Sequence, residues 1–240
     1  MRSERPTLFC PVKMASEMLA PKWTIQILAE LWWGSSHFNE LRRGIPGLSP
    51  SLLAKRLREL EAHGLIERIE SPQTGTVTYL RSAAAVELEP IIQALGEWAY
   101  RNTNVHDRMC HAEPRSFIWH LRHNIATEHL PDRRVTLQIT FPEQPPKSRN
   151  FWIVCKPGEP VDVCYINPGF EVDMFLQAPL ETMVSVFFGY TRLGAEIERE
   201  RISLLGQAAI TRSIGKWLVL SSYAQRRDEI MQPRGRQPSR

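Results

Sequence analysis

The sequence has no long hydrophobic run and no cysteine framework, and both absences exclude classes of protein. Its longest apolar stretches, such as TMVSVFF at 182–188, are far shorter than the roughly 20 residues a helix needs to cross a bilayer. The start, MRSERPTLFCPV, lacks the apolar segment of a secretory signal, so we expect a cytoplasmic protein. The four cysteines show no CxxC pair, and in a reducing compartment we expect them to be free thiols.

Motifs of catalysis are missing as well. The sequence has no nucleophile elbow, phosphate-binding loop or metal box, which indicates a protein that is not an enzyme and has no cofactor. The segments HDRMCH and HLRH gather histidines with one cysteine, but Cys110 and His111 are adjacent and would point apart on a helix. We therefore interpret this region as a polar connecting segment and expect no metal.

The charge distribution is more informative than the total. The formal net charge is only +4, yet the stretch from Leu41 to Arg58 carries five basic residues and no acidic one. The end of the chain, residues 226–240, is also basic and rich in Pro, Gly and Gln, so we expect it to be disordered. An uncompensated basic stretch favours an anionic partner such as a nucleic acid.

The first hundred residues contain three short amphipathic segments, at 12–19, 23–32 and 38–43. In the second segment Trp23, Ile27 and Leu31 recur at helical spacing and predict a buried stripe. We expect Trp23 and its neighbours Trp32 and Trp33 to be core or interface aromatics, not base-stacking side chains. Gly34 and Gly44 end the second and third segments.

The stretch GLSPSLLAKRLRELEAHGLIER, residues 47–68, predicts a helix with two unlike faces. Ser49 is a natural N-cap and Pro50 suits the first helical position, where a missing N–H costs nothing. The leucines at 53, 57 and 60 fall on one side, and Ser51, Lys55 and Arg58 fall opposite. A hairpin (LIERIE, SPQTG, TVTYL) and a long helix from Ser82 to about Asn102 follow.

This element order is that of a winged helix-turn-helix, in which the capped helix reads the major groove of DNA. Residues from Cys10 to about Asn102 resemble the HxlR family of bacterial transcription regulators. The resemblance rests on CPV at 10–12, KWTIQILAEL at 22–31, FNELRRGIPGLSPSLLAKRLRELEAHGLIER at 38–68 and TYLRS before the last helix. The family usually has a Ser-Leu-Thr capping run and a Gly before that helix, where this chain has LRSAAAVELEP.

The winged helix-turn-helix order and the resemblance together predict which residues meet DNA. The predicted contacts are Lys22, Arg42, Arg43, Ser49, Pro50, Ser51, Lys55, Arg58, Gln73, Thr74 and Gly75. The alternative for the basic residues is an ordinary solvated helix face. Arg56 lies beside the leucine stripe, so a local ion pair is at least as good an account of its charge.

Cys10 precedes the first predicted helix. Some members of the HxlR family sense electrophiles or oxidants through an N-terminal cysteine in this motif, and a helix N-terminus favours a reactive thiolate. The alternative is an inert, partly buried cysteine that helps to dock the first helix.

In the second half the pattern changes from helical to alternating. RVTLQITF, NFWIVCK, PVDVCYI and EVDMFLQA predict four strands in a meander, after a helix bracketed by Pro114 and Pro131. An apolar helix at 179–188, a short helix near Leu193, a strand RISLLG and a last helix at 207–220 complete an α+β layer.

Residues from about 134 to 224 are similar to the sterol carrier protein-like domain that follows some HxlR domains. The similarity rests on INPGFEVDMFL, on GY followed by a short helix, and on ISLLG. It implies an apolar ligand pocket, and the candidate lining residues are Trp152, Phe175, Met183, Val186, Phe187 and Trp217. Each of these is also compatible with plain core.

The sequence thus predicts an α+β protein with an N-terminal winged helix-turn-helix domain (1–104), a connecting helical segment (105–131), a sterol carrier protein-like α+β domain (132–225) and a basic tail (226–240). We expect a homodimeric regulator that binds double-stranded DNA at an inverted repeat and responds to an apolar small molecule, with no membrane partner. The rival hypothesis is a carrier of lipids or other hydrophobic ligands that uses the winged domain for dimerisation.

Overall fold

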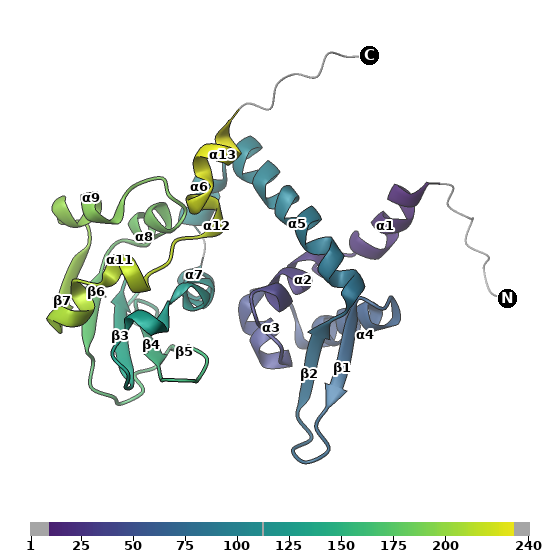
Figure 1. Ribbon diagram of the computed structural model, residues 1–240, viewed down its shortest axis with the longest axis horizontal. Helices are drawn as coiled ribbons and strands as arrows, with labels where there is room; N and C mark the ends of the chain where they lie inside the picture. Colours follow the sequence, from purple (N-terminus) through teal and green to yellow (C-terminus); the bar gives the residue numbers. More distant parts are fainter. Residues whose placement is uncertain (1–9, 112, 233–240) are drawn as a thin grey trace. The chain divides into compact units, whose positions relative to one another are not determined.

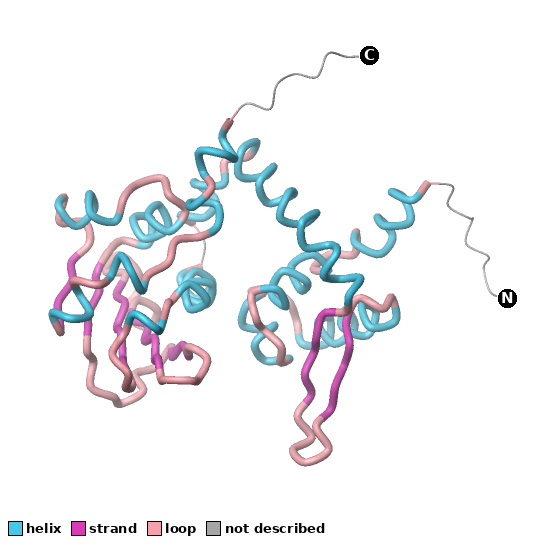
Figure 2. The backbone as a smooth tube through the Cα atoms, viewed as in Figure 1, coloured by secondary structure: helices cyan, strands magenta, loops and turns pink. Residues whose placement is uncertain are grey.

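The computed structural model describes residues 10–111 and 113–232, and the chain divides into two compact units after Ala94. The division falls inside helix α5 (Ala83–Asn102), ahead of the predicted boundary at 104. Figure 1 labels most of the helices and the strands of both units, and Figure 2 distinguishes helices, strands and loops.

The first unit is a helical core with a β-hairpin. Its elements are α1 (Pro11–Leu19), α2 (Thr24–Trp32), α3 (Phe38–Gly44), α4 (Pro50–Ala62), β1 (Ile66–Glu70), β2 (Val77–Arg81) and the start of α5. The core takes Ile27 and Leu31 from α2, as the predicted stripe requires, and Leu41 from α3. The predicted winged helix-turn-helix order of helices, hairpin and long closing helix is therefore confirmed.

The hairpin is joined to the helices by backbone contacts. β1 and β2 pair antiparallel, with Ile66 opposite Arg81 and Glu70 opposite Val77. The Tyr79 N–H donates to the Ser36 carbonyl at 2.8 Å, and His37 Nδ1 lies 3.0 Å from the Val77 carbonyl. These bonds hold β2 at its first residue and at its middle, and the tip extends beyond them (Figure 2).

Helix α5 begins where the sequence predicts, because the Ser82 hydroxyl accepts a hydrogen bond from the Ala85 N–H at 3.2 Å. The apolar side chains of α5 fall into two groups, one packed against the core and one exposed. Leu88 and Ile92 pack against the core of the first unit. Ile91, Leu95 and Trp98, spaced at i, i+4 and i+7, are 54%, 48% and 56% exposed.

The second unit is an α+β layer. Its elements after α5 are α6 (Val105–Cys110), α7 (Pro114–Leu121), η1 (Arg122–Asn124), η2 (Thr127–His129), β3 (Val135–Thr140), β4 (Asn150–Cys155), β5 (Asp162–Cys164), β6 (Met174–Gln177), α8 (Leu180–Phe187), α9 (Leu193–Glu198), β7 (Ser203–Gly206), α10 (Ala208–Thr211), α11 (Ile214–Trp217), α12 (Ser222–Gln225) and α13 (Arg227–Met231). The five-stranded sheet has the order β5-β4-β3-β6-β7. One face carries the core, built with side chains of α7, α8, α10 and α11.

The predicted four-strand meander is wrong in its last step. β3, β4 and β5 do form a meander, but the chain then crosses over and β6 lies parallel to β3. Asp173 explains the position of β6, because its carboxylate accepts from the Thr136 N–H at 2.8 Å and its own N–H donates to the Thr136 carbonyl at 2.9 Å. This buried clamp holds the first residue of β6 beside β3.

Three helical predictions also need correction. The α-helix after Pro114 ends at Leu121 and is followed by the 3-10 helix η1. The chain is then extended at Ile125, which pairs with Leu218. The last predicted helix is two short ones, α10 and α11, since the Ser213 hydroxyl donates to carbonyls of the preceding turn between them. The predicted tail at 226–240 begins with helix α13, which buries Ile230; residues 233–240 lie outside the described residues.

Candidate nucleic-acid interface

The helix-turn-helix of the first unit is α3, a tight turn and α4. Gly44 ends α3 where an added Cβ would lie 2.1 Å from the Glu30 carboxylate, so only glycine allows this approach. Gly47 adopts φ +83° in the turn, which favours glycine. The Ser49 hydroxyl then caps α4 by accepting from the Leu52 N–H at 3.3 Å, with Pro50 in the first turn, as predicted.

Helix α4 has one buried face and one basic, hydroxyl-bearing face. Leu53, Leu57 and Leu60 are at most 2% exposed and hold the helix to the core. Ser51, Lys55 and Arg58 are exposed on the other side. The Lys55 side chain is 61% exposed, and its ammonium lies 3.9 Å from Glu59. A contact this long and this exposed leaves Lys55 able to turn toward a phosphate.

Arg56 does not belong to the exposed face. Its side chain is only 16% exposed; Nε donates to the Lys22 carbonyl at 3.1 Å, and Nη1 pairs with Glu59. The local ion pair considered from the sequence is therefore confirmed. Arg56 ties α4 to the turn before α2.

The other predicted basic contacts lie on the same unit. Arg42 and Arg43 are exposed in the last turn of α3, directly before the turn that leads into α4. Lys22 is exposed before α2, and its ammonium stands 4.6 Å from the centre of the Trp23 ring. Trp23 and Trp32 pack against the core, and Trp33 is 47% exposed.

The predicted wing residues form the hairpin tip. Gln73, Thr74 and Gly75 are all exposed, and Gly75 takes φ +65°. The Thr74 hydroxyl orders the tip by accepting from the Thr76 N–H at 3.2 Å. Arg68 on β1, outside the predicted contacts, is also exposed and pairs with Glu70 at 2.8 Å.

Cys10 is partly exposed at the N-cap position of α1, with a free thiol. Its carbonyl accepts from the Met14 N–H at 3.1 Å, so the backbone here opens the helix. Of the nine residues of α1, all described, none is buried.

The predicted ligand-lining residues of the second unit do not surround one space. Met183, Val186, Phe187 and Trp217 lie in the closed core between sheet and helices. Trp152 on β4 and Phe175 on β6 alternate along their strands with core residues and therefore lie on the other face of the sheet. Phe175 is 40% exposed, whereas its neighbours Met174 and Leu176 are buried.

Neither a cluster of metal ligands nor a membrane-spanning helix is found in the part of the chain that the structure describes. Among the described residues, no three His, Cys, Asp or Glu side chains gather as metal ligands would. No helix within 10–111 or 113–232 is both long and apolar enough to cross a membrane.

The chain is similar to known transcription regulators over its first part. A sequence model of the HxlR-like helix-turn-helix family matches residues 18–107. The uncharacterized HTH-type transcriptional regulator sll1512 of Synechocystis is 36% identical over 87 residues, which are 36% of this chain and 64% of that protein. The regulator YvaP of Bacillus subtilis is 33% identical over 92 residues, 38% of this chain and 85% of that one.

Among solved structures, the redox regulator HypR in its reduced form is 31% identical in sequence, with a TM-score of 0.38. The match covers 41% of this chain and 99% of the HypR chain. The matched region contains α2, the capped helix α4 and the hairpin described above. An element order, a basic exposed helix face and relatives named as transcriptional regulators agree on one assignment. The chain belongs to the HxlR-like helix-turn-helix family of DNA-binding transcriptional regulators, which are not enzymes.

Proposed function

We propose that the protein binds an inverted-repeat operator as a homodimer, with α4 in the major groove and the hairpin tip at the neighbouring minor groove. The observation that supports this most is the division of α4 into a buried leucine face and an exposed face of Ser51, Lys55 and Arg58. A solvated helix needs no such combination of a tight turn, a hydroxyl cap and a row of exposed basic side chains.

The proposed contacts fall into three groups. Ser49, Pro50 and Ser51, at the start of α4, are small enough to let the helix approach base edges. Lys22, Arg42, Arg43, Lys55 and Arg58 neutralise phosphates, and Gln73, Thr74 and Gly75 form the wing contact.

Dimerisation is supported by apolar side chains that the single chain leaves exposed. Ile91, Leu95 and Trp98 follow one helical face of α5, and Val12 and Met14 of α1 are 72% and 55% exposed. Contiguous exposed apolar side chains of this size are typical of protein interfaces. A homodimer would bring two copies of α4 to the two halves of an inverted repeat.

We further propose that the second unit is a sterol carrier protein-like effector domain and that the regulator is cytoplasmic. It is an α+β layer with helices packed on one sheet face, and it would take a hydrophobic small molecule. Ligand binding regulates DNA affinity only if the ligand prefers one arrangement of the two recognition helices. Because the core residues around α8 are closed, this effector must bind elsewhere in the unit or open the core.

Cys10 is proposed as an additional thiol switch, on the basis of its partly exposed thiol at the start of α1. The variant Cys10→Ser should then keep operator affinity but lose its response to diamide. An unchanged response would show that Cys10 is structural.

The central test is a charge reversal on α4. DNA sites recovered by genome-wide mapping serve as probes, and binding is followed by fluorescence anisotropy. We expect the double variant Lys55→Glu, Arg58→Glu to lose at least about 100-fold in affinity and to reduce the salt dependence of binding. The matched control is Arg212→Glu, Lys216→Glu, two exposed basic residues of the second unit with the same charge change.

The control should bind as the parent does. Equal affinity of the α4 variant and the parent would overturn the proposal and favour the rival carrier hypothesis. Sedimentation of the parent and of Leu95→Glu tests the dimer, which the substitution should dissociate.

A further inference from the structure

The second unit contains a polar cavity of about 490 Å³ between α6 and α8. It is lined by His106, Pro179, Glu181, Thr182, Ser185, Tyr190, Thr191, Glu196 and Arg201. This volume lies within the range of small-molecule sites. The cavity is distinct from the hydrophobic core and from every residue predicted to line a ligand pocket.

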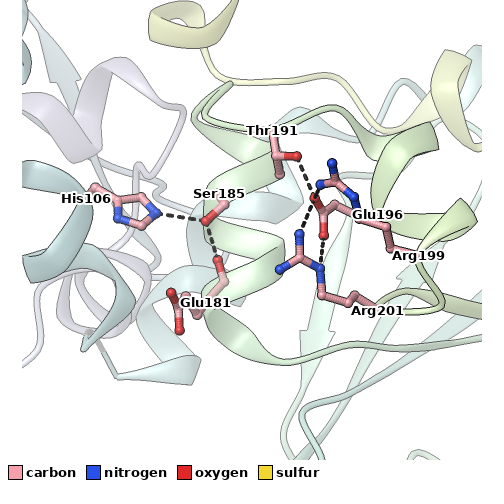
Figure 3. A network of polar contacts seen from close by, with 7 residues as sticks. All are labelled: His106, Glu181, Ser185, Thr191, Glu196, Arg199 and Arg201. Atoms are coloured by element: carbon pink, nitrogen blue, oxygen red, sulfur yellow. Dashed lines mark hydrogen bonds and ion pairs between the residues drawn. The ribbon is translucent and has the colours of Figure 1, made fainter.

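A buried carboxylate fixes the basic wall of the cavity. Glu196 is 0% exposed and accepts from the Thr191 hydroxyl at 2.5 Å. Arg199 Nη1 donates to it at 3.1 Å, and Arg201 pairs through Nη2 at 2.8 Å and Nε at 2.5 Å (Figure 3). The hydrogen bond from Thr191, followed by the bond and charge of Arg201, holds the pKa of Glu196 below its usual value.

The result is an ordered guanidinium at the cavity. Arg201 is held to Glu196 by the hydrogen bond from Nη2 and the ion-pair contact of Nε, yet its side chain is 52% exposed. A guanidinium has five N–H donors, so donors remain for a ligand after Nη2 has donated to Glu196 and Nε has paired with it. Because the side chain is already fixed, little of its own conformational entropy is lost when a ligand binds.

The opposite wall is a Ser–His pair whose polarity excludes nucleophilic chemistry. The Ser185 hydroxyl donates its one proton to the Glu181 carbonyl at 2.7 Å, so it must accept from His106 Nε2 at 2.8 Å (Figure 3). A histidine that donates to serine cannot take the serine proton as a general base. The pair therefore serves to position the imidazole. The imidazole also packs edge to face with the Tyr190 ring, with 4.6 Å between the ring centroids.

The charges limit the ligand to a monoanion. Arg201 lines the cavity with one positive charge, and Arg199, outside the lining, adds a second one beside Glu196. Glu196 and Glu181 carry two negative charges. Glu196 is buried behind the arginines, and Figure 3 shows the Glu181 carboxylate turned away from them, so the guanidinium of Arg201 is the charge a ligand meets first. A doubly charged phosphate would have two carboxylates nearby without enough positive charge to balance them.

We propose that this cavity binds a small monocarboxylate with an apolar body, whose carboxylate pairs with Arg201 while Tyr190 and Pro179 contact the body. The inference rests on the proposed function, because it makes this molecule the effector of the regulator. His106 begins the connection to DNA binding: α6 follows α5 after two residues, and α5 starts in the first unit. A ligand that perturbs the His106–Ser185 bond acts on this chain segment.

The test uses the full-length protein and benzoate as the probe, with benzylamine and inorganic phosphate as comparators. Histidine imidazole resonances are followed by NMR, and His106→Gln assigns the signal of His106. We expect benzoate to shift the His106 signal with a dissociation constant on the order of 1 mM, as suits a ligand of this size, and to leave the exposed His129 unchanged. Benzylamine and phosphate should bind at least about tenfold more weakly.

Arg201→Lys keeps a charge beside Glu196 but lacks the guanidinium fork, so it should weaken benzoate about tenfold. Arg212→Lys, at an exposed arginine outside the cavity, should change nothing. If the Arg201 variant does not fold, the parent titration still decides the question. Absence of a His106 shift, equal binding of benzylamine, or tighter binding of phosphate would each overturn the proposal.

The two proposals fail separately. Benzoate binding at His106 without operator binding would keep the site and remove the regulator mechanism. Operator binding without any benzoate effect on His106 would keep the regulator and remove this effector site.

Discussion

At the scale of single residues, neighbouring basic side chains of α4 have different roles. Lys55 is 61% exposed and touches only the long contact to Glu59. Arg56, the next residue, is 16% exposed and binds the Lys22 carbonyl and Glu59. Helical spacing alone places the two side chains on different faces of α4, because a step of one residue rotates a helix by about 100° and brings Arg56 beside the leucines.

This difference predicts opposite phenotypes for the same substitution. Arg56→Met should lower the free energy of unfolding by about 1 kcal/mol, since it removes the hydrogen bond to the Lys22 carbonyl and the ion pair with Glu59. It should leave operator affinity within about threefold. Lys55→Met should leave unfolding unchanged and weaken operator binding. Urea unfolding and anisotropy measure the two quantities on both variants; a loss of stability in Lys55→Met instead would contradict the assignment.

At the scale of elements, the turn between α3 and α4 depends on one close approach. An added Cβ at Gly44 would meet the carboxylate of Glu30, which is 1% exposed and accepts from the Ser35 hydroxyl at 3.0 Å. A flexible side chain could move aside at little cost, but this one is buried and hydrogen-bonded. Displacing it breaks that bond inside the core.

We therefore expect Gly44→Ala to destabilise the first unit by about 1–3 kcal/mol. The matched control is Gly194→Ala in helix α9, where an added Cβ has open space, and it should be neutral or stabilising by up to about 1 kcal/mol. Urea unfolding compares the two. A neutral Gly44→Ala would mean that Glu30 relaxes without cost.

Strand locations in the second unit could be predicted from the sequence, but the connections between the strands could not. Alternation in RVTLQITF marks β3 because one face is buried and the period of a strand is two. Nothing in the local pattern says that β6 lies parallel to β3, since that depends on Asp173 meeting the backbone of Thr136, 37 positions away. Turn signals favour hairpins, and the longer crossover from β5 to β6 has no comparable signature.

At the scale of the whole molecule, predictability follows sequence distance. In the first unit the cap at Ser49, the leucine stripe and the hairpin are all local signals, so the proposed DNA-facing residues could be named in advance. In the second unit the cavity joins His106 to Ser185 across 79 positions. His106 stood in a cluster interpreted as a polar connecting segment, and no spacing pointed to its partner on α8.

The pH dependence of stability is a property of the whole molecule to which one half-buried side chain, His120, contributes. Burial, with a smaller effect from the positive charge of Arg122, lowers the pKa of His120 to about 4, from 6.5 for a free imidazole. Below pH 6.5 the unfolded chain therefore gains a proton that the folded chain does not. The contribution of neutral His120 to the free energy of unfolding is therefore present above pH 6.5 and is lost as the pH falls from 6.5 to about 4.

Between pH 6.5 and pH 5 this difference should cost about 2 kcal/mol of unfolding free energy. His120→Gln removes the titrating group, so urea unfolding at the two pH values should differ by about 2 kcal/mol less in the variant than in the parent. His129→Gln, at an exposed histidine, should keep the parent's difference. An NMR titration that finds His120 protonated above pH 6 in the folded protein would contradict this account, because a histidine that charges in place cannot favour the unfolded chain in that range.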